Sequence, residues 1–129
     1  DGDIRADSGT IYTPMVDMGT LAAGATTNTA SLDDSQRHFG VVNTTSTRRV
    51  FVADHKDGAT LTVVVVFIGT VPGSADFGFS CDGAEVIRWP VGGLDLTLMD
   101  SGEFLVVDFI CCEYAGVKTW LACPSYGFN

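Results

Sequence analysis

Short runs of apolar and β-branched residues recur along the chain, and each run ends at a cluster of glycine, proline, aspartate or serine. Runs of this length at intervals of about 8 to 12 residues are typical of strands joined by turns in a sandwich or barrel. Turn signals such as Asp57-Gly58, Asp82-Gly83 and Ala115-Gly116 separate them. The predicted strands cover residues 10–16, 37–43, 47–53, 59–69, 76–81, 84–89, 94–99, 103–114 and 117–123.

Helical periodicity is almost absent, since no apolar series with a 3.6-residue period continues beyond two turns. One helical turn is expected at most, at residues 33–36. The sequence therefore predicts an all-β fold, an antiparallel β-sandwich or jelly roll of about 8 to 10 strands with little or no helix. Residues 1–9 are predicted to form a polar tether, and residues 10–129 a single β-sandwich domain. Pro14 cannot donate to a strand ladder, which places it at an edge or a bulge.

Two predicted strands are apolar on both faces, because alternate residues of a strand point to opposite sides. In residues 103–112, only Asp108 of the second face suits water. In residues 59–68, the second face changes from Thr60 and Thr62 to purely apolar residues. Monomers rarely expose apolar patches beyond a few hundred Å², so we expect subunit contact to cover these faces. The apolar residues on these second faces are Val64, Val66, Ile68, Phe104, Val106, Ile110 and Cys112.

The composition supports a single folded domain with an acidic surface. The chain has 129 residues, 46% of them hydrophobic and only 18% charged, which excludes general disorder. Its formal net charge of -9 disfavours nucleic acid and anionic membranes as partners. The longest uninterrupted apolar run, from Val63 to Ile68, is far shorter than the roughly 20 residues of a membrane span, so no membrane insertion is expected. Because the chain begins with Asp1, we expect it to be part of a longer polypeptide or a processed product.

Catalytic and metal-binding patterns are missing from the sequence. There is no G-x-S-x-G elbow, no H-E-x-x-H pair and no phosphate-binding glycine loop, so we expect no enzyme, no catalytic residues and no cofactor. Asp54, His55 and Asp57 could hold a cation, but an Asp-x-x-Asp-Gly segment before a strand favours a hairpin turn. Asp1 and Asp3 lack the other oxygen ligands of a calcium loop. No metal site is therefore predicted.

Cysteines and aromatic residues each allow two interpretations. The spacing of the four cysteines matches neither zinc pairs nor a redox C-x-x-C, which favours free thiols in a protein made in a reducing cytoplasm. The larger aromatic side chains could form a sugar-stacking platform, although packing in the core and at strand ends is the simpler interpretation. The cysteines are Cys81, Cys111, Cys112 and Cys123, and the aromatic residues are Trp89, Tyr114, Trp120, Tyr126 and Phe128.

Four pieces of the C-terminal half occur in a characteristic order. They are DGATLTV at residues 57–63, VIRWPVGG at 86–93, SGEFLVVDF at 101–109 and KTWL at 118–121. Together they resemble the C-terminal module of bacteriophage tail fibre and tail-associated proteins. The resemblance implies a non-enzymatic β-sandwich or jelly roll, usually trimeric, at the surface of a virion. Leu121 stands where the module has an aromatic residue, and the long strand with Cys111-Cys112 is not part of the pattern, so a capsid decoration or spike protein stays open.

We therefore expect a structural or adhesion component of a phage virion: a tail fibre tip, a tail-associated protein or a capsid decoration protein. Its expected partners are further copies of itself in a homotrimer, other virion proteins of the capsid or tail, and a host-surface glycan or receptor. The protein would be assembled in the host cytoplasm and end at the virion surface. The alternative is a carbohydrate-binding module of a larger secreted polypeptide, which the aromatic residues and the missing initiator Met suggest.

Overall fold

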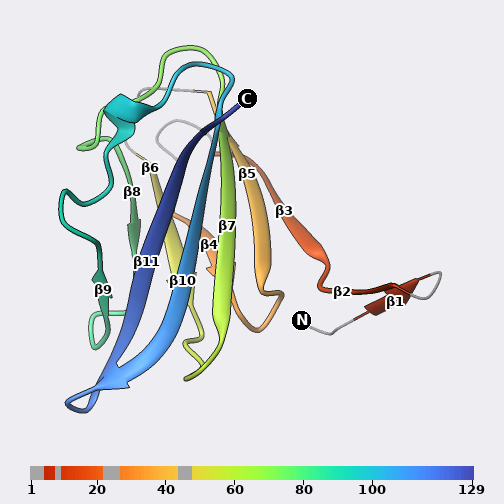
Figure 1. The fold of residues 1–129 in the computed structure, drawn as a ribbon, viewed down its shortest axis with the longest axis vertical. Coiled ribbons are helices and arrows are strands. Elements are labelled where there is room, and N and C mark those ends of the chain that lie inside the picture. Colours follow the sequence, from red (N-terminus) through yellow and green to blue (C-terminus); the bar gives the residue numbers. More distant parts are fainter. Residues whose placement is uncertain (1–4, 8–9, 22–26, 44–47) are drawn as a thin grey trace.

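The computed structural model describes residues 5–7, 10–21, 27–43 and 48–129. Two sheets pack face to face, and the six-stranded sheet lies in front of the three-stranded sheet in Figure 1. The larger sheet has the order β3-β5-β7-β10-β11-β9 and the smaller one β4-β6-β8. The strands of the larger sheet are β3 (Met15–Leu21), β5 (Arg37–Val42), β7 (Thr60–Phe67), β9 (Val86–Arg88), β10 (Phe104–Tyr114) and β11 (Val117–Phe128). Those of the smaller sheet are β4 (Asn28–Ser31), β6 (Arg48–Ala53) and β8 (Phe77–Ser80).

The core fills the space between these two layers. Alternate residues of β7, from Leu61 to Phe67, are completely buried, and so are the alternate residues of β10 from Leu105 to Phe109. They meet Val50 and Val52 of β6, which are also completely buried. This inward alternation is the feature by which the sequence specifies an all-β sandwich, and the predicted fold class is confirmed.

Strand direction differs from the antiparallel pairing expected from the sequence. β7, β10 and β11 are antiparallel neighbours, but β3-β5-β7, β4-β6-β8 and β11-β9 are parallel. From β3 to β8 the chain alternates between the two sheets, so neighbours within a sheet are every second strand of the chain. Two reversals of direction leave such neighbours parallel. Side-chain alternation reports which face is buried and carries no information on strand direction, which is why the sequence did not reveal it.

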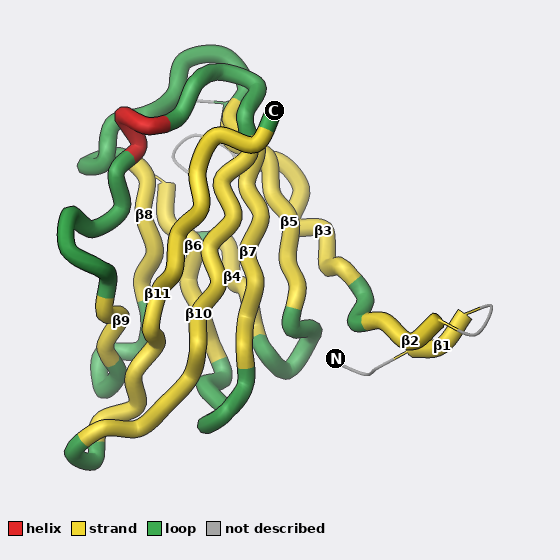
Figure 2. The backbone as a smooth tube through the Cα atoms, viewed as in Figure 1, coloured by secondary structure: helices red, strands yellow, loops and turns green. Residues whose placement is uncertain are grey.

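Two predicted segments differ locally. The predicted strand at residues 94–99 is a 3-10 turn, η1 (Leu96–Leu98), because Asp95 caps it by accepting a hydrogen bond from the Thr97 amide. The predicted first strand is divided at Pro14 into β2 (Thr10–Tyr12) and the edge strand β3. β2 pairs with β1 (Arg5–Asp7), so a short hairpin occupies part of the segment that the sequence describes as a tether. This hairpin stands apart from the sandwich (Figure 2).

Candidate functional site

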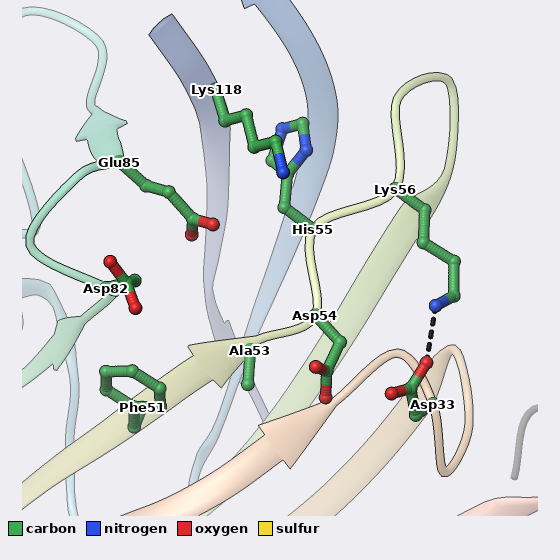
Figure 3. Close-up of a pocket in the computed structure, with 9 residues that line it drawn as sticks. All are labelled: Asp33, Phe51, Ala53, Asp54, His55, Lys56, Asp82, Glu85 and Lys118. Atoms are coloured by element: carbon green, nitrogen blue, oxygen red, sulfur yellow. Dashed lines mark hydrogen bonds and ion pairs between the residues drawn. The ribbon is translucent and has the colours of Figure 1, made fainter.

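A polar hollow of about 360 Å³ opens where the loop after β6 meets the ends of β9 and β11 (Figure 3). Its wall combines carboxylates, two lysines and one aromatic ring. The lining residues are Asp33, Phe51, Ala53, Asp54, His55, Lys56, Asp82, Glu85 and Lys118. The hollow therefore contains Asp54 and His55, two of the three residues that the sequence nominated as a possible cation site.

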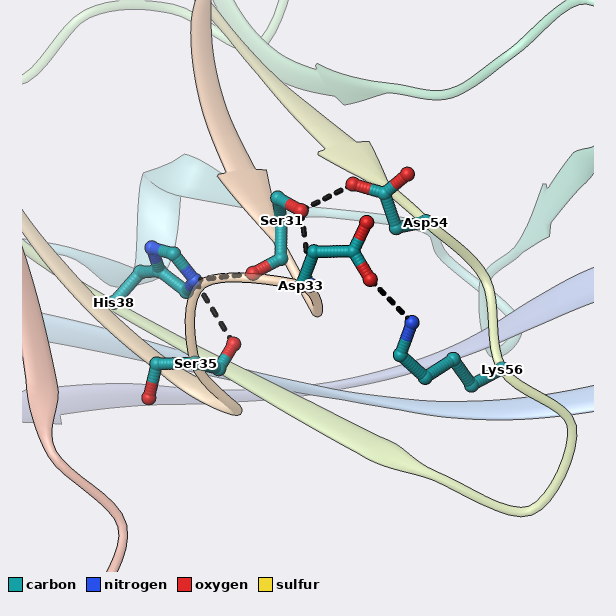
Figure 4. Close-up of polar contacts among 6 residues, drawn as sticks. All are labelled: Ser31, Asp33, Ser35, His38, Asp54 and Lys56. Carbon is teal, nitrogen blue, oxygen red and sulfur yellow. Dashed lines mark hydrogen bonds and ion pairs between the residues drawn. The ribbon is translucent and has the colours of Figure 1, made fainter. Parts of the chain in front are cut away.

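Short contacts fix the turn on one side of this hollow (Figure 4). Lys56 forms an ion pair with Asp33, and the Ser31 hydroxyl donates to Asp54 while accepting from the Asp33 amide. The hydrogen bond from Lys56 lowers the pKa of Asp33, and the same bond raises the pKa of Lys56. Asp54 has a φ of 63°, a left-handed conformation that aspartate tolerates. These side chains serve a turn, but not the predicted hairpin turn, because the segment connects β6 of the smaller sheet to β7 of the larger sheet.

His55 is tied to backbone rather than to a ligand. Its Nε2 lies 3.1 Å from the carbonyl oxygen of Cys112 and 3.0 Å from that of Thr119, so it donates to both β10 and β11. Its ring meets Trp120 edge-on, with centroids 5.2 Å apart. Within the described ranges, no three His, Cys, Asp or Glu side chains converge closely enough to hold a metal ion. His55 therefore joins the loop after β6 to the β10–β11 hairpin.

His38 has a similar structural role in the core. It is completely buried, and its Nε2 lies 3.0 Å from the carbonyl oxygens of both Ser31 and Ser35 (Figure 4). Donation to two carbonyls assigns the proton to Nε2. The Ser35 hydroxyl donates to the Pro14 carbonyl instead of to the imidazole. No serine nucleophile is thus paired with a histidine base here.

The aromatic residues do not form one sugar-stacking platform. Trp120 is completely buried, and its indole nitrogen donates to Glu85 at 2.9 Å. Trp89 is partly buried and packs against the core, with its ring centroid 6.1 Å from that of Phe109. Tyr114 lies at the turn of the β10–β11 hairpin, whereas Phe128 lies opposite Phe104 at the other end. Core and strand-end packing, the simpler interpretation, describes Trp89 and Trp120.

All four cysteines are free, and they differ in exposure. Cys111 is buried, whereas its neighbour Cys112 points to the other face of β10, as the alternation predicts. Burial raises the pKa of the Cys111 thiol and also that of the Cys81 thiol. The negative charges of the nearby Glu85 and Asp82 raise the pKa of Cys81 further. Cys123 is exposed on β11 beside Asp108. Neither Cys81 nor Cys111 is thus placed as an activated thiolate.

The outer face of the larger sheet is a second surface to consider. We define the outer face as the side of β5, β7, β10 and β11 that points away from the smaller sheet. Strand register arranges its side chains in cross-strand rows. The rows are, in order: Val41, Val66, Phe104 and Phe128; Phe39, Val64, Val106 and Ser125; Arg37, Thr62, Asp108 and Cys123; and Thr60, Ile110 and Leu121.

The third row carries the charged side chains of this surface, Arg37 and Asp108, and Ser125 and Thr60 add polar side chains to the second and fourth rows. Thr62 and Asp108 lie opposite each other in the third row, and the Thr62 hydroxyl donates to the Asp108 carboxylate at 2.5 Å. Apolar side chains elsewhere on the face remain in contact with water: Ile110 is 44% exposed and Leu121 38%. The sequence identified the β7 and β10 parts of this face. It did not predict the contribution of Phe39 and Val41, because strand order cannot be read from alternation.

Among the described residues, no helix is long and apolar enough to cross a membrane. Comparison with protein-family models, with curated proteins and with solved structures finds no match for the chain.

Proposed function

We propose that the chain is a non-enzymatic structural component of a phage virion and assembles as a homo-oligomer, a trimer, through the outer face of its larger sheet. The observation that carries the proposal is the apolar surface of that face. Two of its four cross-strand rows are apolar on both β7 and β10, a third has the apolar Ile110 on β10 opposite Thr60, and the charged Asp108 is already bonded to Thr62.

The size of the outer face supports an interaction surface. Strands lie about 4.8 Å apart and each residue advances about 3.3 Å, so the face from Ile110 to Phe104, polar positions included, covers roughly 15 by 20 Å, about 300 Å² in projection. Apolar patches of about 300 to 600 Å² are the largest that typical monomers expose, and they are often functional. Covering apolar surface stabilises the assembly by about 25 cal/mol per Å² removed from water.

The virion location is supported by the ordered sequence pieces around Trp89-Pro90 and Thr119-Trp120. In the fold they belong to β9, to the loop after it and to β11, which are parallel neighbours.

Sedimentation of the full chain at micromolar concentration under reducing conditions tests the assembly. We expect a trimer for the wild type and a monomer for Val64→Lys and Val106→Lys, because each variant places an ammonium group in the middle of the outer face. Thr29→Lys is the matched control, since it makes the same change at an exposed position of β4 in the smaller sheet. A wild-type monomer, or face variants that assemble like the control, would contradict the proposal.

The location is tested on particles purified by density gradient from a phage lysate in which the gene is expressed. We expect quantitative mass spectrometry to find the chain at a fixed copy number per particle. Recovery of the chain only in the soluble fraction would contradict the virion assignment, whatever the oligomeric state.

A further inference from the structure

The hairpin of β1 and β2 is an element without a partner in the described part of the chain. It forms a two-stranded sheet of its own, in which Arg5 lies opposite Tyr12 and Asp7 opposite Thr10. Two-stranded hairpins with no further support are at best marginally stable in water. A packing surface outside the chain's own sandwich would supply that support.

The exit of this hairpin from the sandwich is held in place. The Pro14 carbonyl accepts a hydrogen bond from the hydroxyl of Ser35, which is completely buried in the turn before β5. Thr13 precedes Pro14, and its hydroxyl oxygen lies 3.5 Å from the side-chain oxygen of Gln36. Proline also fixes its own φ near -65°. The hairpin therefore leaves from the edge strand β3 and extends away from both sheets (Figures 1 and 2).

The outer face is smaller than the surface that one partner buries in a standard stable interface. Its projected area of about 300 Å² is well below the roughly 800 Å² that each partner buries in a standard stable interface. The unpartnered hairpin begins at the same sheet, on the edge next to β5, and would add contact area to the outer face.

We propose that the β1–β2 hairpin of one copy packs on the outer face of the next copy. This inference rests on the proposed assembly and specifies its contact. The two surfaces in contact are different parts of the chain, so the contact is head-to-tail, and head-to-tail contacts close into rings when the rotation permits. A ring of three would support every hairpin and cover every outer face. A twofold contact of one outer face with another would leave the hairpins unsupported.

Two full-length variants test this contact. The double variant Ala6→Pro, Asp7→Pro damages the hairpin. Successive strand residues direct their amide groups to opposite sides, so one of these two amides faces β2, and proline removes its hydrogen-bond donor. Val64→Lys damages the outer face and leaves the hairpin sequence intact. We expect each variant alone to sediment as a monomer.

Mixing the two variants gives the decisive result. The intact hairpin of the Val64→Lys chain can pack on the intact outer face of the proline variant, so the mixture should contain a species of two chains that neither variant forms alone. Amide hydrogen exchange on residues 5–12 should be slow in the wild-type oligomer and fast in the Val64→Lys monomer.

Several outcomes overturn the inference and leave the proposed assembly intact. The first is a proline variant that still forms a trimer, and the second is a mixture that contains only single chains. The third is a Val64→Lys monomer whose hairpin amides are as well protected from exchange as in the wild-type oligomer, because the hairpin would then be stabilised within its own chain. A wild-type protein that sediments as a monomer removes both proposals at once. Circular dichroism of each variant verifies that the sandwich is folded.

Discussion

The hydrogen bond between Trp120 and Glu85 allows a quantitative prediction about the core. Trp120 is completely buried, its indole nitrogen lies 2.9 Å from a Glu85 carboxylate oxygen, and its ring meets Phe109 edge-on at 6.2 Å. Trp120→Phe retains an aromatic ring and removes the donor. We expect it to lower the free energy of unfolding by about 2 kcal/mol, less than the 3 to 5 kcal/mol typical of tryptophan to alanine.

The hydrogen bond itself can be separated from the packing by a double-mutant cycle of Trp120→Phe and Glu85→Ala. A bond to a charged group contributes about 1.5 to 3 kcal/mol. Because Glu85 is only half-buried, water weakens this interaction, and we expect a coupling energy of about 1 kcal/mol. For a denaturant slope of about 2 kcal/mol/M, that coupling corresponds to roughly 0.5 M in the urea midpoint.

The assay is urea unfolding at 25 °C in reducing buffer, followed by far-ultraviolet circular dichroism so that the signal does not depend on the mutated tryptophan. The matched control is a cycle of Trp120→Phe with Asp82→Ala, a neighbouring carboxylate that bonds the Ala84 amide. We expect additivity within about 0.5 kcal/mol for this control. Equal coupling in both cycles would refute the assigned bond, and an unchanged stability of Trp120→Phe would refute the buried position of the ring.

Three further predictions concern the turns and the ionisable groups. Ala115→Gly should stabilise the protein by about 0.5 to 1 kcal/mol in urea unfolding, because Ala115 has a φ of 53° in the β10–β11 turn, where glycine is not strained. Iodoacetamide followed by mass spectrometry should modify the exposed Cys123 first and Cys111 last. Burial raises the pKa of Cys111, so its contribution to stability is fully present below the unfolded-state value of 9.0 and is lost as the pH rises through the higher folded-state value. The pKa of Asp33, measured by carbon-detected NMR, should lie below 3.8 and should move towards 3.8 in Lys56→Met. The contribution of Asp33 to stability is present above pH 3.8 and is lost as the pH falls through the folded-state pKa.

Each of these has a contrary outcome. Ala84→Gly, in a turn without a positive φ at that alanine, should be neutral or destabilising, so an equal gain there would contradict the strain at Ala115. Modification of Cys111 at the rate of Cys123 in folded protein would contradict its burial. An Asp33 titration that does not change in Lys56→Met would contradict the ion pair.

Much of the fold could be predicted because burial follows the alternation of β7 and β10. Leu61, Val63 and Val65 alternate with Thr62 and Val64, and the structure buries the first set completely. Strand direction was not predictable, since it depends on whether a connection returns to the same sheet or crosses to the other. The same limit applies to the outer face, where Phe39 became a neighbour of Phe104 only through strand order, with ring centroids 6.4 Å apart.

The candidate chemistry was predicted less completely. The pattern around Asp54 and His55 indicated a turn, although the hairpin was wrong because β6 and β7 belong to different sheets. Nothing local in the sequence shows that His55 bonds the carbonyl oxygens of Cys112 and Thr119. Such a contact joins residues far apart in the chain and is set by packing. The same holds for Trp120, whose partner Glu85 lies in the turn before β9.

The central claim is that a second copy covers the outer face, and the most direct measurement is the mass of the wild-type chain in solution. Sedimentation velocity at micromolar concentration in reducing buffer should give three times the chain mass of 13.6 kDa. In the same sample, alkylation of Cys123 should slow as the protein is concentrated, because this thiol lies on the outer face beside Asp108. A mass of 13.6 kDa, with Cys123 equally reactive at every concentration, would contradict the account.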